Sequence, residues 1–510
     1  MASSAADRLI LPPDDRFNQR LVENVHPQDW KNPEPAKRYN LVVIGGGTAG
    51  LVTAAGAAGL GAKVALIERN LLGGDCLNVG CVPSKALIRA ARTIAELRRA
   101  SEFGVTIPNG WTVDFSAIME RMRALRAEIS PHDSAKRFAS LGVDVFLGDG
   151  IFRDGETIEV GGSPLKFSRA VIATGARAAI PNIPGLTEAG YLTNETVFQL
   201  TELPRRLAIL GGGPIGCELA QAFSRFGSEV TLFEKHSQLL PKEDPDAASI
   251  IQEIFQREKI KVLFESEIEH IELQGTEKHL TYRAAGQKET CVVDAILVSA
   301  GRQPNVEDLG LEQAGVLFDP RQGITVDDQL RTSHPHIYAA GDICSKYRFT
   351  HAADAMARIV IRNALFLGRE KVSSLTIPWC TYTDPEIAHV GLTERMAEEQ
   401  AIAIETFKQP LDRVDRALLD GETSGLAKIH VKKGTDKIVG ATLVSAHAGE
   451  SISEITLAMV AGKGLKTLAS VIHPYPTQAE MLKKTADAYQ RTRLTPFVKG
   501  LFEKWLAWRR

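Results

Sequence analysis

The chain has 510 residues and is 44% hydrophobic, enough for about three or four domains with packed cores. Its formal net charge of -2 excludes a nucleic-acid-binding protein that depends on bulk positive charge. Six cysteines are too few for a disulfide framework in a chain of this length, so they indicate a reducing compartment such as the cytoplasm. No apolar run approaches the roughly 20 residues that a membrane span needs.

The first 38 residues are rich in proline, aspartate and arginine. They contain no apolar core of the kind that a signal peptide needs. This composition predicts an irregular leader or linker over 1–38.

A strand–helix–strand unit follows the leader. The β-branched run at 39–44 predicts a buried strand, 51–59 predicts a helix of small residues, and 63–67 predicts a second strand. The residues that connect and end these elements are Gly45, Gly47, Gly50 and Glu68. Glycines let the backbone approach a pyrophosphate at a helix N-terminus, and a carboxylate binds ribose hydroxyls, so the unit predicts a dinucleotide site.

The segment 73–85 places two cysteines five positions apart. Pro83 suits the first turn of a helix, and the positive end of the helix dipole favours a thiolate there. The thiols of Cys76 and Cys81 therefore predict a redox switch. A zinc site is the alternative, but zinc ligands usually stand two to four residues apart and need a second pair, whereas the other four cysteines are scattered.

A second strand–helix–strand unit repeats the first. The strand at 206–210 leads through glycines into a helix, and the strand at 229–233 ends in an acid. The corresponding residues are Gly211, Gly213, Gly216 and Glu234. Two such units imply two dinucleotides, unless the second is a degenerate copy that binds nothing. Helical patterns at 115–129 and 247–257 fit crossover helices.

Glu234 bears on which nicotinamide nucleotide is used. A carboxylate about 4 Å from a 2′-phosphate repels each of its negative charges by roughly 1–4 kcal/mol. The residue therefore favours NADH over NADPH. Lys235 and His236 follow it directly and can offset this repulsion.

Together these motifs resemble the class I pyridine nucleotide-disulfide oxidoreductases, a flavin-dependent family that includes dihydrolipoamide dehydrogenase, glutathione reductase and mercuric reductase. The resemblance covers about 39–489. GGDCLNVGCVPSK at 73–85 looks like the family's redox-active disulfide motif, and IYAAGD at 337–342 looks like its second flavin motif. Further segments that look like family motifs are VIATGA at 171–176, LVSAGRQPN at 297–305 and TDPEIAHVG at 383–391.

The resemblance implies an α/β fold with two Rossmann-like domains, for FAD and NAD(P), and a C-terminal α+β dimerisation domain. We expect the FAD domain at 39–185 and 306–375, the NAD(P) domain at 186–305, the dimerisation domain at 376–490 and an amphipathic tail at 491–510. The implied cofactor-binding residues are Gly45, Gly47, Gly50, Glu68, Lys85, Thr174, Gly175, Gly211, Gly213, Gly216, Glu234, Gly301, Gly341 and Asp342. No resident metal site is predicted.

The resemblance also implies an electron relay. Cys81 would lie against the flavin as the charge-transfer thiol, and Cys76 would face the acceptor as the interchange thiol. Lys85 would lie near flavin N5, paired with Glu218. An ammonium group there stabilises the reduced, anionic flavin, and the carboxylate keeps that ammonium charged when it is desolvated.

The chain departs from the family near its C-terminus. Disulfide reductases of this family have a His-Pro-Thr motif whose histidine is an acid/base, with a glutamate three residues after the threonine. Here Tyr475 takes the histidine position and Glu480 fits the glutamate. A phenol with a pKa of about 10 is a poor base at neutral pH, although it can donate a proton. His473 replaces the missing base only if the loop turns differently, and plain packing at the dimer interface is a further interpretation of Tyr475.

The segments 219–233 and 415–429 look most like the mercuric reductase branch, which shares the tyrosine. Mercuric reductases also carry a C-terminal cysteine pair and an N-terminal Cys-x-x-Cys domain, and neither is found in this sequence. Hg(II) or another soft electrophile is the leading acceptor, and the lipoamide of a dihydrolipoamide dehydrogenase, or another small disulfide, is second. If Tyr475 and Glu480 follow the family, they reach Cys76 of the other subunit of a homodimer. A hypothesis of another class is a redox-sensing or membrane-anchored flavoprotein with little turnover.

Large apolar residues recur at helical spacing in 494–510, among lysines and arginines. Such a basic amphipathic helix with tryptophans can lie on a membrane surface as a peripheral contact. Packing on the protein's own dimer is the interpretation that we prefer. Apart from this membrane contact, we expect a cytoplasmic protein.

Overall fold

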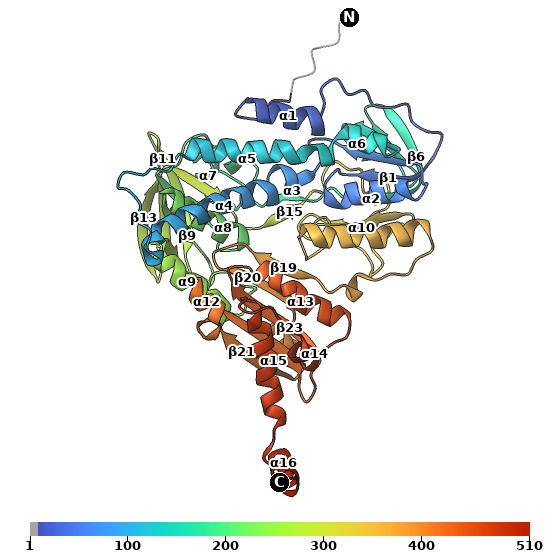
Figure 1. Ribbon diagram of the computed structural model, residues 1–510. Helices are drawn as coiled ribbons and strands as arrows, with labels where there is room; N and C mark the ends of the chain where they lie inside the picture. The colour runs from blue at the N-terminus through green and yellow to red at the C-terminus, as the bar shows by residue number, and fades with distance from the viewer. Residues whose placement is uncertain (1–8) are drawn as a thin grey trace, which may run out of the picture.

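The computed structural model describes residues 9–510, so residues 1–8 of the expected leader lie outside the described part of the chain. Two α/β domains lie side by side, and an antiparallel C-terminal domain lies below them (Figure 1). The helices α3 (Gly74–Asn78), α4 (Cys81–Arg98) and α5 (Phe115–Ile129) run across the upper part of the molecule in Figure 1, from the side of the first α/β domain toward the second. The predicted fold class is confirmed.

The first α/β domain is built on a 7-stranded sheet. Across the sheet its strands are β3 (Val143–Leu147), β2 (Val64–Glu68), β1 (Tyr39–Ile44), β6 (Ser163–Ile172), β5 (Thr157–Val160) and β4 (Gly150–Phe152), with β18 (Ile337–Ala339) paired to β6. Three helices of this domain are α2 (Thr48–Gly59), α6 (Ala135–Ser140) and α10 (Thr350–Leu365). The chain leaves β1 at Gly45, where φ is +105° and a Cβ would lie 2.4 Å from the carbonyl oxygen of Ala173. Only glycine fits where the strand turns toward α2.

The second α/β domain has a smaller parallel sheet and an antiparallel one. The parallel strands are β10 (Lys261–Leu263), β9 (Glu229–Phe233), β8 (Arg206–Leu210) and β14 (Ala295–Val298). The antiparallel strands are β11 (Glu267–Gln274), β12 (Glu277–Ala284) and β13 (Gln287–Val293). Its helices are α7 (Leu186–Ala189), α8 (Pro214–Phe226) and α9 (Pro245–Arg257). Two short paired strands, β7 (Ala176–Ala178) and β15 (Arg302–Pro304), connect it to the first domain.

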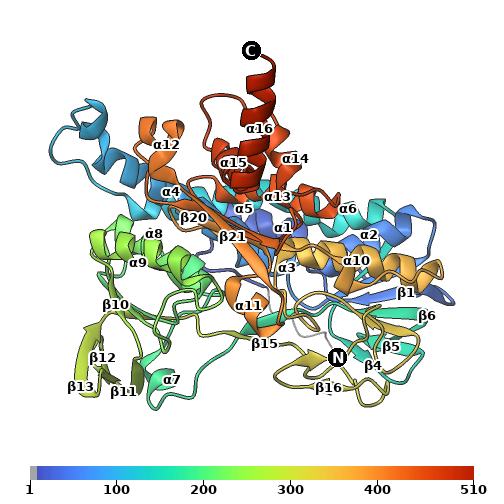
Figure 2. The same cartoon turned by 90° about the horizontal axis from the view of Figure 1, so that it is seen from below.

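The C-terminal domain is a 5-stranded antiparallel sheet covered by helices. Its strands are β19 (Pro378–Thr381), β20 (Glu386–Gly391), β23 (Ile438–Ser445), β22 (Leu426–Lys432) and β21 (Ile404–Pro410). Its helices are α11 (Glu394–Glu399), α12 (Asp415–Leu419), α13 (Ala448–Val460), α14 (Leu465–Ser470) and α15 (Glu480–Arg493). A last helix, α16 (Pro496–Trp508), projects from the body of the molecule and has no buried residue (Figures 1 and 2).

The leader contains a helix, α1 (Arg16–Val25). Asp15 caps its N-terminus by accepting hydrogen bonds from two backbone N–H groups, and Leu21 and Val25 have no exposed surface. The expectation of an irregular leader is therefore wrong for residues 16–25, because a cap and an apolar face outweigh the surrounding prolines. Among residues 9–510, no helix combines the length and hydrophobicity that a bilayer span requires.

Candidate redox-active site

The first glycine loop leaves space at the N-terminus of α2. Gly47 is the N-cap of this helix, and a Cβ on it would meet no atom closer than 3.7 Å. A Cβ on Gly50 would lie 1.8 Å from the carbonyl oxygen of Gly45, so helix and strand touch there. Burial raises the pKa of Glu68, whose Oε2 accepts a 2.6 Å hydrogen bond from the N–H of Gly46. These residues fit the pyrophosphate and ribose of a dinucleotide.

The second glycine loop has the same construction. A Cβ on Gly213, the N-cap of α8, would meet no atom within 4 Å. A Cβ on Gly216 would lie 1.9 Å from the carbonyl oxygen of Gly211. The buried Glu234 accepts a 2.7 Å hydrogen bond from the N–H of Gly212. This loop therefore also fits a dinucleotide.

The other expected cofactor residues lie at two places. Thr174, Gly175 and Gly301 are next to the connecting strands β7 and β15, and Gly341 and Asp342 follow β18 of the first domain. Thr174 Oγ1 donates a 2.9 Å hydrogen bond to the carbonyl oxygen of Asn305. Burial raises the pKa of Asp342, although Arg302 Nε lies 3.5 Å from its carboxylate. Arg302 also pairs with Asp75, which directly precedes the first cysteine of the pair. Arg302 thus links the loop of the cysteine pair to the second flavin motif.

The two cysteines lie at successive helix ends and are free thiols. Cys76 belongs to α3, and Cys81 is the first residue of α4. A hydrogen bond from Cys76 lowers the pKa of Cys81 to about 6 against the effect of burial, and Thr350 and Lys85 act in the same direction. The same hydrogen bond, together with burial, raises the pKa of Cys76 well above its usual range. Cys81 is therefore the thiolate of the pair at neutral pH.

Lys85 lies one turn into α4 and forms an ion pair with Glu218 of α8, with Nζ and Oε2 2.8 Å apart. Burial alone would lower the pKa of Lys85, but the Glu218 carboxylate outweighs it and the pKa is raised. The Lys85 ammonium also lies 4.4 Å from the ring centroid of Tyr382, whose backbone N–H donates to Glu218. The lysine is thus kept charged beside the Cys81 thiolate. Tyr382 was not predicted, although it directly precedes the TDPEIAHVG segment.

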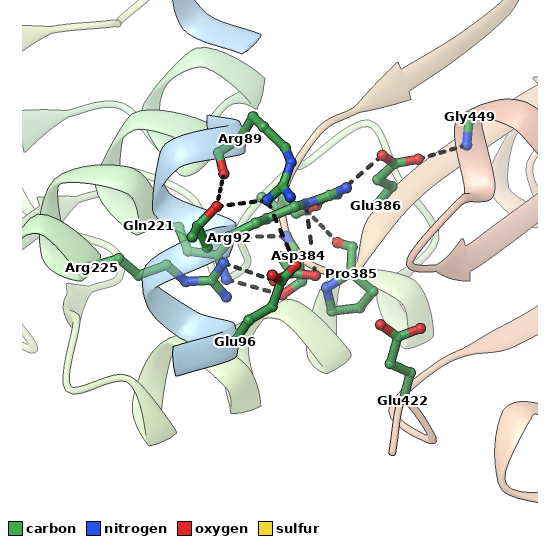
Figure 3. Close-up of polar contacts among 12 residues, drawn as sticks. Arg89, Arg92, Glu96, Gln221, Arg225, Asp384, Pro385, Glu386, Glu422 and Gly449 are labelled. Atoms are coloured by element: carbon green, nitrogen blue, oxygen red, sulfur yellow. Dashed lines mark hydrogen bonds and ion pairs between the residues drawn. The ribbon is translucent and has the colours of Figure 1, made fainter. Parts of the chain in front are cut away.

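A polar network holds this part of the site to the C-terminal domain (Figure 3). Arg92 of α4 donates to Glu386 at 3.0 Å, and Arg225 of α8 donates to Asp384 at 2.8 Å. The N–H of Asp384 donates to Gln221 of α8 at 2.8 Å. Because α4 and α8 carry Lys85 and Glu218, this network fixes the distance between that pair.

Tyr475 and Glu480 lie on the C-terminal domain. Tyr475 is 71% exposed, and its hydroxyl donates a 2.9 Å hydrogen bond to Asp415 at the start of α12. That hydrogen bond raises the pKa of Tyr475. Glu480 Oε2 lies 3.6 Å from Lys484 Nζ on α15. No contact with the cysteine pair of the same chain is seen for either residue within 9–510.

His473 is paired within the same domain. Its Nε2 lies 3.2 Å from both carboxylate oxygens of Glu454 on α13, and only 6% of its side chain is exposed. The loop therefore turns Tyr475 outward and His473 inward. His473 is therefore not turned outward in place of Tyr475.

Residues 39–357 match the family described as pyridine nucleotide-disulphide oxidoreductase, and residues 377–486 match its dimerisation domain. The mercuric reductase of Staphylococcus aureus is 36% identical over 453 residues, which cover 89% of this chain and 83% of that protein. The dihydrolipoyl dehydrogenase of Chlamydia trachomatis is 35% identical over 457 residues, covering 88% and 96%. Among solved structures, the HOCl-induced flavoprotein disulfide reductase RclA from Escherichia coli superimposes with a TM-score of 0.79 and 30% identity, covering 88% of this chain and 99% of that one.

Proposed function

Because the chain belongs to the pyridine nucleotide-disulphide oxidoreductase family, we propose that it passes electrons from a nicotinamide nucleotide through FAD to the Cys76–Cys81 pair and on to an acceptor. Members of the family depend on FAD and use NAD(P)H as the donor. The observation that carries this proposal is the asymmetric cysteine pair, in which Cys81 has a pKa of about 6 beside the Lys85–Glu218 ion pair.

FAD, when bound, supplies the two-electron carrier between the nicotinamide and sulfur. The first glycine loop, Glu68 and Asp342 would hold it, and the second glycine loop and Glu234 would hold the nicotinamide nucleotide. Lys85 keeps a positive charge beside Cys81, which favours the thiolate. Glu218 keeps that lysine protonated.

The two cysteines perform the transfer to the acceptor. In the reduced pair, Cys76 is the protonated thiol and Cys81 the thiolate, so Cys76 has to give up its proton before its sulfur bonds to the acceptor. With Hg(II), two electrons leave the pair, the Cys76–Cys81 disulfide forms, thiol protons are released and Hg(0) is the product. With an organic disulfide the same electrons cleave the acceptor S–S bond, and the released thiolates need protons.

We propose that the acceptor is Hg(II) or another soft electrophile. A phenol bonded to Asp415, with a pKa above its usual value, is a weaker base than an imidazole, and His473 is held by Glu454. Reduction of a soft metal needs no general acid, so the tyrosine does not impede it. Lipoamide or another small disulfide is the alternative acceptor, supported by the similarity to dihydrolipoyl dehydrogenases.

We also propose that NADH is preferred to NADPH. Glu234 is a buried carboxylate at the end of β9, where it would meet a 2′-phosphate. His236 donates its backbone N–H to the same carboxylate at 2.8 Å, and its Nε2 lies 3.9 Å from that carboxylate, so the imidazole offsets the repulsion only when it is protonated.

The match to the dimerisation domain supports a homodimer. We propose that Tyr475 and Glu480 complete the partner's acceptor site, as the family resemblance implies. The tail helix α16 exposes Phe497, Leu501, Trp505 and Trp508, and we propose that this face packs on the dimer. A peripheral membrane contact is the alternative. Flotation with anionic liposomes of the intact chain and of a chain ending at Arg493 distinguishes the two, because equal flotation excludes the membrane.

The acceptor proposal is tested by a direct comparison of turnover. Holoenzyme and NADH are mixed either with Hg(II) in excess small thiol or with lipoamide, at the same pH. Faster turnover with Hg(II) supports the proposal, and faster turnover with lipoamide supports the alternative. A holoenzyme that neither NADH nor NADPH reduces would instead point to the redox-sensing or slowly turning-over flavoprotein.

A further inference from the structure

The N-terminal helix α1 lies outside the family match, which begins at residue 39, yet it packs against the loop of the cysteine pair. It lies along α5, above the position of α3 (Figure 1). Its end is tied to the loop by the N–H of Leu72, which donates a 3.2 Å hydrogen bond to the carbonyl oxygen of Val25. His26 forms a further contact with the carbonyl oxygen of Asn70. The segment that precedes the family domain is therefore attached close to Cys76.

Asn18 is a polar residue of α1 that is buried in the protein, with 1% of its surface exposed. Its amide nitrogen donates to the carbonyl oxygens of Pro13 at 2.8 Å and Leu11 at 3.3 Å. Its amide oxygen accepts a 2.5 Å hydrogen bond from Arg126 of α5. The amide nitrogen of Asn18 thus binds the leader, and its amide oxygen binds α5.

Arg126 spans from α1 to the backbone between the two cysteines. Its other terminal nitrogen donates a 2.7 Å hydrogen bond to the carbonyl oxygen of Asn78, the last residue of α3. The Asn78 side chain in turn donates to the carbonyl oxygens of Leu72 and Gly74. One guanidinium group therefore connects α1 to the turn that sets the separation of Cys76 and Cys81.

Burying the Arg126 guanidinium costs desolvation free energy. The residue is 5% exposed, and no carboxylate among residues 9–510 forms an ion pair with it. Burial lowers its pKa to about 10, so it is still charged at neutral pH. Its two terminal nitrogens donate to the carbonyl oxygen of Asn78 and to Asn18, whereas its Nε is buried without a hydrogen-bond partner, so these two bonds are what offsets the cost of burying the cation.

We propose that Arg126 is a positioning residue for the cysteine pair, which holds the Cys76–Cys81 turn through the carbonyl oxygen of Asn78 and is itself oriented by Asn18 of the N-terminal helix. The inference rests on the proposed role of these cysteines as the redox pair. The hydrogen bond from Arg126 to the carbonyl oxygen of Asn78 restricts the turn between the two cysteines. A restricted turn keeps the two thiols close together, which favours the disulfide over the dithiol. Loosening the turn favours the dithiol.

Arg123 provides a matched control on the same helix. It is also buried, and its Nε donates a 2.5 Å hydrogen bond to Asp15 of α1. No bond from Arg123 to the loop 70–81 is present in the described part of the chain. Removing Arg123 therefore weakens the attachment of α1 without touching Asn78.

The experiment measures the Cys76–Cys81 disulfide in full-length holoenzyme equilibrated with dithiothreitol buffers, by alkylation of free thiols and peptide mass spectrometry. We expect Arg126→Met to raise the equilibrium constant for reduction by about tenfold, and Arg123→Met to leave it within about twofold of the wild type. Hydrogen exchange of the backbone amides at 77–80 should accelerate in the first variant and not in the second.

Equal effects of the two arginine variants, or no effect of Arg126→Met, would overturn the inference. If Arg126→Met does not fold, Arg126→Lys replaces it, because a lysine keeps the charge but cannot hold both oxygens as a planar fork does. A smaller shift in the same direction supports the inference, and an unchanged equilibrium overturns it. If the wild type forms no disulfide between Cys76 and Cys81, the proposed function itself fails, which is a distinct result.

Discussion

The donor side and the acceptor side of the cysteine pair are built differently. On the donor side, Cys81 is held beside Thr350 and Lys85, and the lysine is fixed by Glu218 and Tyr382. On the acceptor side, Tyr475 is exposed and bonded only to Asp415 at the surface of another domain. The donor side therefore has its charges arranged within one chain, whereas in the homodimer proposed above a partner subunit completes the acceptor side. On that proposal, residues of one chain set the chemistry of the thiols, and residues of the partner set the choice of acceptor.

The largest effect should come from the donor side. Cys81→Ser replaces the thiolate by a hydroxyl that stays protonated, and we expect turnover with any acceptor to fall by at least about 1,000-fold. Cys291→Ser changes a cysteine on β13, remote from the pair in the sequence, and should keep turnover within about twofold. Steady-state assays with Hg(II) and lipoamide measure both variants. Substantial turnover in Cys81→Ser would place the reactive sulfur elsewhere.

Substitutions of Tyr475 on the acceptor side should change the preference between acceptors rather than abolish turnover. Tyr475→His supplies a base that is poised near neutral pH, so lipoamide turnover should rise by about 10- to 100-fold. Tyr475→Phe removes the hydroxyl without adding a base, and it should give no such rise. The ratio of kcat/KM values for lipoamide and Hg(II) is the measurement. An unchanged ratio in Tyr475→His would show that proton transfer does not limit disulfide reduction.

The thiolate of the donor side should titrate near pH 6. Because the pKa of Cys81 is lowered to about 6, the thiolate forms as pH rises through that value and is lost as pH falls below it. We expect the long-wavelength thiolate-to-flavin band of the reduced holoenzyme to follow this titration. Cys76→Ala removes the hydrogen bond that is the main cause of the lowered Cys81 pKa, so the midpoint of this titration should rise by about one pH unit or more. Lys85→Met removes a weaker cause and should raise the midpoint less. The reverse order of these shifts would contradict the hydrogen bond as the main cause.

The parts that sequence predicts well are those whose cause is local. The glycines of both loops and the acids Glu68 and Glu234 follow from local spacing. A Cβ would collide with backbone at Gly45, Gly50, Gly211 and Gly216, and at Gly47 and Gly213 it would enter the space left for a nucleotide. The helical pattern at 115–129 coincides with α5 because its apolar period is local as well.

The parts that sequence misses depend on contacts between distant segments. Thr350 lies 269 positions from Cys81, and no motif marks it. Arg126 faces α1 across 108 positions, and on a helix of mixed composition it resembles an ordinary surface arginine. The leader helix was missed because prolines on both sides hide the cap at Asp15. These features become visible only when the fold brings the segments together.

The smallest effect concerns the choice of nicotinamide nucleotide at the second glycine loop, which is on the donor side. Glu234→Gln removes one negative charge but keeps an oxygen that can accept from the N–H of Gly212, so the loop should stay in place. At high effective dielectric a charge about 4 Å away is worth about 1 kcal/mol, so the preference for NADH over NADPH should fall by about fivefold. Glu68→Gln is the matched change in the first loop, where the carboxylate accepts from Gly46 in the same way. It should weaken retention of FAD and leave the nicotinamide preference unchanged, as judged from the ratio of kcat/KM values for the two nucleotides. If both variants changed that ratio equally, the two loops would not have the separate roles that distinguish donor binding from the flavin site.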